Sequence, residues 1–134
     1  MLVPQDVIRR DIIRVHDDID NPAIKLIEDI ARYGTTIRYD VIIEGILGKE
    51  KYGSLLRRVS CLFDQTFVFY FDIDFEETLG RHQYKLEKKH EFGEKEMKEW
   101  WLEHDVLGVP GELLIPASLT EDETLRLLLK TIAG

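Results

Sequence analysis

Three short apolar runs restrict how this chain can fold more than any other feature of its sequence. They lie at 41–43, at 67–71, where the expected strand begins one residue earlier at Thr66, and at 113–115. A strand with one face in water alternates apolar and polar residues, whereas short continuous runs are typical of strands covered on both faces. We therefore expect three covered strands at these positions, preceded by a strand stub at 2–3 that ends at Pro4.

Segments with the apolar spacing of amphipathic helices separate these runs. The second helix is expected either to be capped by Gly34 or to be prolonged by Ile37 and Tyr39, and Thr120 with Glu123 forms a capping box before the last helix. Strands that alternate with helices predict a parallel sheet with helices on both faces, in one α/β domain over 1–134. The expected helices begin near Asp6 and at Asn21-Pro22, then cover 49–63, 75–82, 94–104 and the segment after Thr120.

The composition excludes several classes of protein. With 44% hydrophobic and 33% charged residues the chain fits a globular domain, and its formal net charge of −8 disfavours binding to DNA, RNA or anionic lipid. No apolar run approaches the roughly 20 residues that cross a bilayer, and the N-terminus lacks the pattern of a signal peptide. A single cysteine, Cys61, cannot form an internal disulfide, so we predict a cytoplasmic protein.

Polar residues follow the predicted strands at the sheet edge where open parallel sheets bind ligands. Gln5, Asp6, Arg9 and Arg10 come after the first strand, and a carboxylate beside guanidinium groups can orient a hydroxyl next to an anion. Alternatively, Asp6 caps the helix that it precedes and the two arginines are solvated.

An acidic residue also follows the strand at 41–43. Glu44 could contact Mg²⁺ through water, as acids at the ends of nucleotide-binding strands do, or it could be a turn or cap carboxylate.

Residues 81–90 form a local basic segment in this acidic chain. Arg81, Lys85, Lys88 and Lys89 could belong to a flap over about 81–105 that closes on phosphates, or to a solvated surface helix. The four histidines show no zinc-binding pattern.

A phosphate-binding loop of the Walker A type is absent from the 134 residues. Gly48-Lys49 is the only Gly-Lys pair, but Glu50 follows it and Ile43 stands where the first glycine is required. Neither Gly-x-Gly-x-x-Gly nor Gly-x-Ser-x-Gly occurs, which leaves dinucleotide binding and serine hydrolysis without support.

Four blocks, in their order along the chain, carry a resemblance to a known family. They are Val-Pro-Gln-Asp-Val-Ile-Arg-Arg-Asp at 3–11, Val-Ile-Ile-Glu-Gly-Ile-Leu at 41–47, Tyr-Phe-Asp at 70–72 with 75–82, and Glu-Phe-Gly at 91–93 with Trp100-Trp101. The set resembles bacterial P-loop kinases of the zeta-toxin and uridine-kinase-like group. The resemblance runs from Met1 to the final helix and is not specific to one substrate.

The resemblance implies a role for each candidate. Asp6 would be the base or orienter for the acceptor hydroxyl, and Glu44 would lie near Mg²⁺. Arg81 would approach the phosphates of ATP from a lid. Lys85 stands where the group often has a second lid arginine, and a lysine lacks the bidentate fork. Further contacts to the substrate would come from Gln5, Arg9 and Arg10, and to the phosphates from Lys85, Lys88 and Lys89.

The resemblance also implies that a first central strand, the Walker A loop and the first helix are missing from these residues. Such a unit takes about 30 residues and supplies most of the electrostatic stabilisation of phosphoryl transfer. The missing strand would lie between the strands at 41–43 and 66–71. We therefore expect those two strands to pair directly, or to form an exchanged homodimer through their exposed edges.

Two functions follow as expectations. The first is an ATP- and Mg²⁺-dependent kinase that phosphorylates a small hydroxyl-bearing substrate, such as a nucleoside or nucleotide-sugar, and that is inactive in the form given. The alternative is a non-catalytic ligand-binding or interaction module derived from such a kinase. A scaffold without a ligand is a weaker third possibility.

Overall fold

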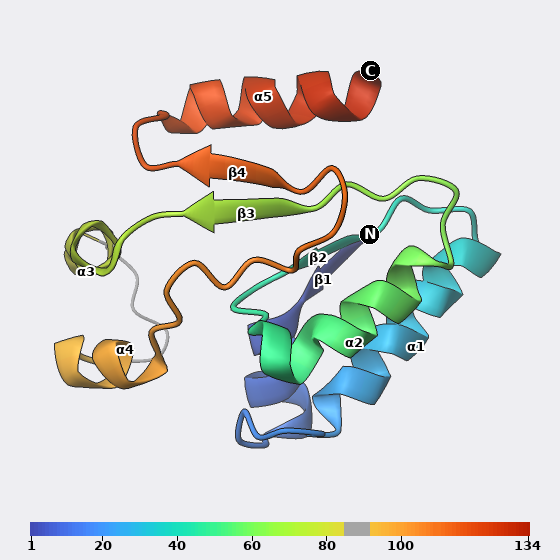
Figure 1. Cartoon of the computed structure of the whole chain (residues 1–134). Coiled ribbons are helices and arrows are strands. Elements are labelled where there is room, and N and C mark those ends of the chain that lie inside the picture. The colour runs from blue at the N-terminus through green and yellow to red at the C-terminus, as the bar shows by residue number, and fades with distance from the viewer. Residues whose placement is uncertain (85–91) are drawn as a thin grey trace. The chain divides into compact units, whose positions relative to one another are not determined.

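A computed structural model describes residues 1–84 and 92–134 (Figure 1). The described part is a mixed α/β fold with two parallel two-stranded sheets and six helices. It divides into two compact units, residues 1–66 and 67–134, and each is described by itself. No helix in the described part is both long and apolar enough to span a bilayer.

The first unit contains one strand pair and three helices. Its elements are β1 (Leu2–Pro4), the π-helix η1 (Val7–Ile13), α1 (Ala23–Thr36), β2 (Ile42–Glu44) and α2 (Lys49–Ser60). β1 and β2 run parallel, with Val3 opposite Ile43 and Pro4 opposite Glu44. The two carboxyl ends therefore lie at the same edge of the pair.

The core of this unit lies between β1, η1, α1 and α2. Among the described residues, the apolar side chains that form this core belong to residues 1–66, among them fully buried Ile27 and Leu55. Burial of such side chains is the main favourable contribution to folding. The buried members are Val3, Ile8, Ala23, Ile27, Ala31, Tyr52, Leu55 and Val59.

The start of α1 follows the prediction, and its end does not. The side-chain oxygen of Asn21 accepts a hydrogen bond from the Ala23 amide at 3.1 Å, which satisfies one free donor of the first turn. The predicted cap at Gly34 is wrong, because the helix continues to Thr36. A methyl group at position 34 would come within 2.5 Å of Val41 Cγ2, so this glycine permits close packing inside the helix.

An ion pair joins α1 to α2. Arg58 donates two hydrogen bonds to Glu28 Oε2, at 2.9 and 3.2 Å, and these bonds with the charge of Arg58 lower the pKa of Glu28 below its ordinary value of 4.5.

We expect Glu28→Gln to reduce the free energy of unfolding at pH 7 by about 0.5–1 kcal/mol, as for exposed ion pairs. Because the pKa of Glu28 is lower in the folded protein, its ionised carboxylate stabilises the fold above pH 4.5. This contribution is lost as the pH falls through the lowered pKa. In urea denaturation the difference should be largest at pH 7 and shrink as the pH is lowered below 4.5, and a difference that does not change with pH would contradict the role of the ion pair.

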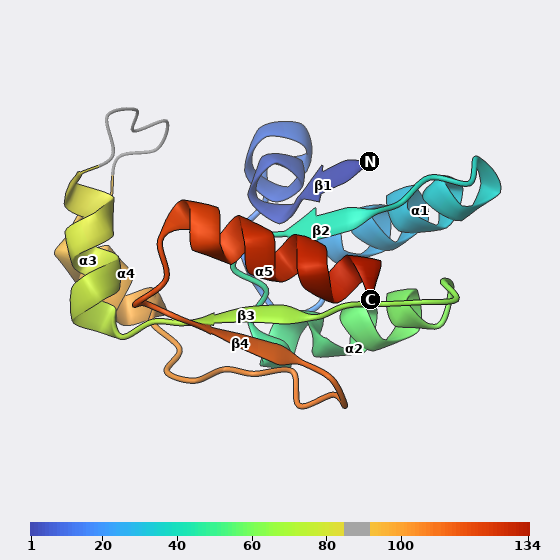
Figure 2. The same cartoon turned by 90° about the horizontal axis from the view of Figure 1, so that it is seen from above.

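The second unit contains the other strand pair. Its elements are β3 (Phe69–Asp72), α3 (Phe75–Gln83), α4 (Glu94–Trp100), β4 (Leu113–Pro116) and α5 (Glu121–Ala133). β3 and β4 are parallel from Phe69 opposite Leu113 to Asp72 opposite Pro116. Figure 2 shows α3 and α4 beyond the carboxyl ends of these strands.

The helix boundaries in this unit agree with the sequence in two cases and differ in one. α3 matches its prediction within one residue, and the capping box of Thr120 and Glu123 at the start of α5 is confirmed. The Thr120 amide donates to the Glu123 carboxylate and lowers its pKa. α4 ends at Trp100 rather than 104, because Trp101 is extended and its ring packs edge-on against Phe75, 5.5 Å away between centroids.

The prediction that the strands are covered on both faces is wrong for the described residues. In β2, Ile42 is 62% exposed, and in β3, Phe71 is 53% exposed. In the first unit, Leu2 lies opposite Ile42 and shares its exposure. One apolar face of each strand therefore remains open to solvent.

Within each unit the strands form one parallel pair: β2 pairs with β1, and β3 pairs with β4. The direct pairing expected between the strands at 41–43 and 66–71 would join the two units and stays a prediction. Because each strand already has a parallel partner on one side, only one edge of β2 and one edge of β3 could accept a further strand. The exchanged dimer, the other expectation, stays a prediction.

Candidate functional site

The carboxyl ends of β1 and β2 bring two of the predicted segments together. Pro4 is opposite Glu44, so Gln5 and Gly45 follow at the same edge. A methyl group on Gly45 would lie 3.0 Å from Gln5 Cβ, which shows that the two residues are in contact. The candidates after the first and second strands therefore belong to one locality.

Asp6 lies between two arginines. Its Oδ1 atom is 3.1 Å from the Arg9 guanidinium and 3.5 Å from Arg10 Nε. Asp6 makes no side-chain cap to the helix that follows, in contrast to the simpler alternative for this residue. A π-helix is rare and occurs frequently at functional sites, and here η1 places both arginines beside one carboxylate.

Arg9 is more deeply packed than the sequence suggested. Its side chain is only 10% exposed, and besides Asp6 it contacts the Val15 carbonyl at 3.2 Å and Asp17 Oδ1 at 3.7 Å. All of these partners belong to the same unit. Arg9 therefore holds the segment 6–17 together, whereas Arg10, which also contacts Asp6, is 25% exposed.

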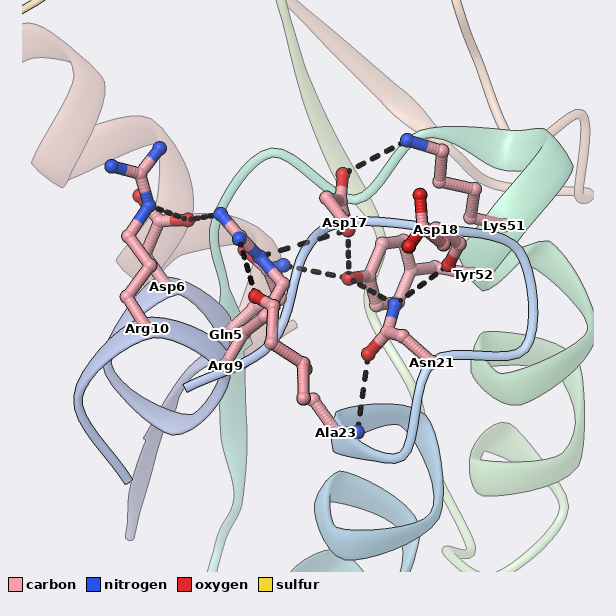
Figure 3. Close-up of polar contacts among 11 residues, drawn as sticks. Gln5, Asp6, Arg9, Arg10, Asp17, Asp18, Asn21, Ala23, Lys51 and Tyr52 are labelled. Carbon is pink, nitrogen blue, oxygen red and sulfur yellow. Dashed lines mark hydrogen bonds and ion pairs between the residues drawn. The ribbon is translucent and has the colours of Figure 1, made fainter. Parts of the chain in front are cut away.

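Behind this edge lies a buried polar network centred on Tyr52 (Figure 3). The Tyr52 hydroxyl donates to the Asp17 carboxylate, and it accepts from Gln5 Nε2 at 2.7 Å and from Asn21 Nδ2 at 3.3 Å. Lys51 pairs with the second Asp17 oxygen at 3.2 Å. The network thus connects β1, the loop before α1, and α2.

Burial raises the pKa of the Tyr52 phenol above its ordinary value of 10. The hydrogen bond to Asp17 raises the pKa further, and donation by Asn21 and Gln5 opposes both effects. The hydroxyl therefore stays protonated and remains a donor to Asp17 at neutral pH. The sequence predicted only that Tyr52 lies in the helix over 49–63 and did not indicate this role, although a buried tyrosine usually needs a partner for its hydroxyl.

Glu44 ends β2 with its side chain exposed and, within residues 1–84 and 92–134, without a bonded partner. The turn or cap alternative is therefore not supported by any contact of the described part. Within the same residues, no group of three or more His, Cys, Asp or Glu side chains is placed to hold a metal ion. Glu44 alone fits an outer contact to a hydrated Mg²⁺, and the other ligands would have to come from water or phosphate.

Gly45 provides a test of how tightly this edge is built. Its φ of +138° is a conformation that residues with a side chain rarely adopt, and a methyl group would lie 3.2 Å from Gln5 Oε1. We expect Gly45→Ala to lower the free energy of unfolding by about 1–2 kcal/mol through backbone strain. Gly80→Ala, where a methyl group meets nothing within 4 Å, is the matched control and should be neutral or stabilising in the same urea titration. Equal effects of the two substitutions would contradict the contact.

The lid candidates belong to the second unit. Arg81 donates to Glu77 at 2.8 Å and to the Ala117 carbonyl at 3.0 Å, and its side chain is 45% exposed. Lys85, Lys88 and Lys89 lie outside the described residues. On either side of them, the rings of His82 and Phe92 stack at 4.6 Å.

The second unit also has a polar depression beyond the carboxyl ends of β3 and β4. Its volume is about 350 Å³. His104 lies here with a positive φ of 47°, and its Nδ1 is 3.1 Å from Asp72 Oδ1. Sequence reasoning placed His104 at the end of a helix and missed this contact between positions 32 residues apart. The lining residues are Asp72, Ile73, Asp74, Trp101, Glu103, His104 and Ala117.

Comparisons with known proteins add no assignment to this geometry. A scan against models of protein families, a search of curated proteins and a search of solved structures each found no match to this chain.

Proposed function

We propose that this chain is the acceptor-binding and lid portion of an ATP-dependent phosphotransferase of the P-loop kinase type, acting on a small hydroxyl-bearing compound such as a nucleoside or nucleotide-sugar. The observation that carries the proposal is the placement of Asp6. It lies at the carboxyl end of β1, between Arg9 and Arg10, at the edge that also carries Glu44. An acceptor hydroxyl needs a carboxylate in such a place as general base or orienter.

The pairing of the strands supports the same proposal. A continuous sheet of order β1, β2, a further strand, β3, β4 would contain the two parallel pairs that the structure has. The exposed apolar residues Ile42 and Phe71 are those that a three-layer arrangement would cover. We propose that a strand, phosphate-binding loop and helix complete this sheet, whether in the same polypeptide or from a partner. An exchanged homodimer through the same edges is the other way to satisfy them.

The residues at hand fit only part of an ATP and Mg²⁺ site. Glu44 is available to a hydrated Mg²⁺, and Arg81 is half exposed in the lid segment. The Gly-Lys-Ser/Thr loop that cradles phosphates is absent from the 134 residues. The proposed substrate is a small-molecule phosphate acceptor, and the net charge of −8 argues against nucleic acid or a membrane surface as partner.

Calorimetric titration of Mg-ATP tests whether ATP binding depends on a phosphate-binding loop outside these 134 residues. We expect the 134-residue chain to bind Mg-ATP with a dissociation constant of about 1 mM or weaker, because backbone amides and the loop lysine supply most phosphate contacts in P-loop proteins. Micromolar binding by this chain alone would contradict the proposal.

A non-catalytic binding module is a second candidate, favoured by one observation. The hydrogen bonds that join Gln5, Asn21 and Tyr52 all form within residues 1–66. Such a module would bind the hydroxyl compound without transferring phosphate. The reading frame upstream of Met1 distinguishes the two: a strand followed by Gly-x4-Gly-Lys-Ser/Thr supports the kinase, and its absence supports the module.

A further inference from the structure

The Tyr52 hydroxyl fixes which way the Gln5 amide points. A phenol has one proton, and that of Tyr52 goes to the Asp17 carboxylate, which accepts it. The phenol oxygen must therefore accept from Gln5, at 2.7 Å. Nitrogen rather than oxygen of the Gln5 amide thus faces Tyr52, and a flipped amide would set two acceptors against each other.

The Gln5 amide oxygen is left as a buried acceptor. Gln5 is 1% exposed, and its Oε1 has no hydrogen-bond partner within the described residues. Most buried acceptors in folded proteins have a partner, so an orphan calls for an explanation. Oε1 lies beside Gly45, since a methyl group there would come within 3.2 Å of it, and Gly45 is itself exposed.

We propose that Gln5 Oε1 accepts a hydrogen bond from a hydroxyl of the ligand that binds beside Asp6. The inference rests on the proposed function and names the substrate class for the same site. Adjacent residues would then offer two acceptors, the Asp6 carboxylate for the hydroxyl that is phosphorylated and the Gln5 oxygen for a second hydroxyl. The ligand is a polyhydroxylated compound, and the turn at Gly45 shifts to admit it, which a glycine permits at low cost.

Carbon NMR of the Gln5 side chain tests the inference directly, with uridine as probe. The chain has three glutamines, so ¹³C-glutamine labelling gives a simple spectrum in which Gln65 and Gln83 are internal references. Saturating uridine should move the Gln5 Cδ resonance downfield, as expected when its oxygen gains a donor. With 2′,3′-dideoxyuridine, which keeps the 5′ hydroxyl but lacks the other two, Cδ should not move. No movement with uridine, or equal movement with both compounds, overturns the proposal.

A variant tests whether Tyr52 positions the amide. Tyr52→Phe should weaken uridine binding about tenfold, the loss expected for one hydrogen bond, and leave dideoxyuridine binding unchanged. Tyr33→Phe, at an exposed tyrosine of the same unit, is the matched control and should change neither affinity. Equal losses of affinity for both ligands would assign Tyr52 a purely structural role and overturn the claim that it positions the Gln5 amide. None of these titrations contains ATP, so their failure is distinguishable from a failure of phosphotransfer.

Discussion

Replacing Ile27 with alanine should lower the free energy of unfolding of residues 1–66 by about 3 kcal/mol, the usual cost of deleting a buried aliphatic side chain. Ile27 is fully buried in a core that, among the described residues, is formed by residues 1–66. The loss combines the transfer of the missing carbons to water with the cavity that they leave. The measurement is urea denaturation followed by circular dichroism.

The control for this prediction is Ile132→Ala in α5. Ile132 is 51% exposed and belongs to the second unit, so its truncation should change the free energy of unfolding by no more than about 0.5 kcal/mol. Similar effects of the two substitutions would contradict a self-contained core in the unit that carries Asp6.

Replacing Tyr52 with phenylalanine should cost about 2 kcal/mol, although only one oxygen atom is removed. The change leaves the buried Gln5 amide nitrogen without its acceptor, and it removes one of the acceptors of Asn21 Nδ2 and one of the donors to Asp17. Gln5 and Asn21 are almost fully buried and cannot turn to water instead. Tyr33→Phe is again the matched control, and a Tyr52→Phe variant as stable as that control would contradict the network.

The same variant should change the stability at alkaline pH. The pKa of Tyr52 is raised in the folded protein, so the neutral phenol stabilises the fold fully below pH 10 and this contribution is lost as the pH rises through the raised pKa. Between about pH 10 and 12 the wild type should therefore lose stability more steeply than Tyr52→Phe, because phenylalanine has no proton to lose. Burial also raises the pKa of Tyr70, but that residue is common to both proteins and cancels in the comparison. If the free energies of unfolding of the two proteins fell in parallel with rising pH, the link between the raised pKa of Tyr52 and stability would be contradicted.

Local signals in the sequence predicted much of the fold. The capping box at Thr120 and the start of α1 after Asn21 depend on a few neighbouring residues and were confirmed. The location of Asp6 and Glu44 at one edge followed from the rule that parallel strands present their carboxyl ends together, and the register agrees.

Features that depend on partners distant in the sequence were not predictable in this way. The apolar run at 41–43 does not reveal that only one of its faces is covered within the described residues, since that depends on which layers are present. Gly34 resembles a helix end in sequence but makes room for Val41. The hydroxyl of Tyr52 and the burial of Arg9 become visible only when β1, the loop at Asp17 and α2 are brought together.

The central claim is that Asp6 lies in the acceptor site of a phosphotransferase, and transfer of the γ-phosphate of ATP tests it most directly. The assay uses the complete product of the reading frame that contains these residues, with Mg-ATP and uridine as the acceptor probe. We expect transfer to uridine that falls by about 10²–10⁴ in Asp6→Asn, the contribution typical of a general base. Absence of transfer by the complete product, or transfer that Asp6→Asn leaves unchanged, would contradict it.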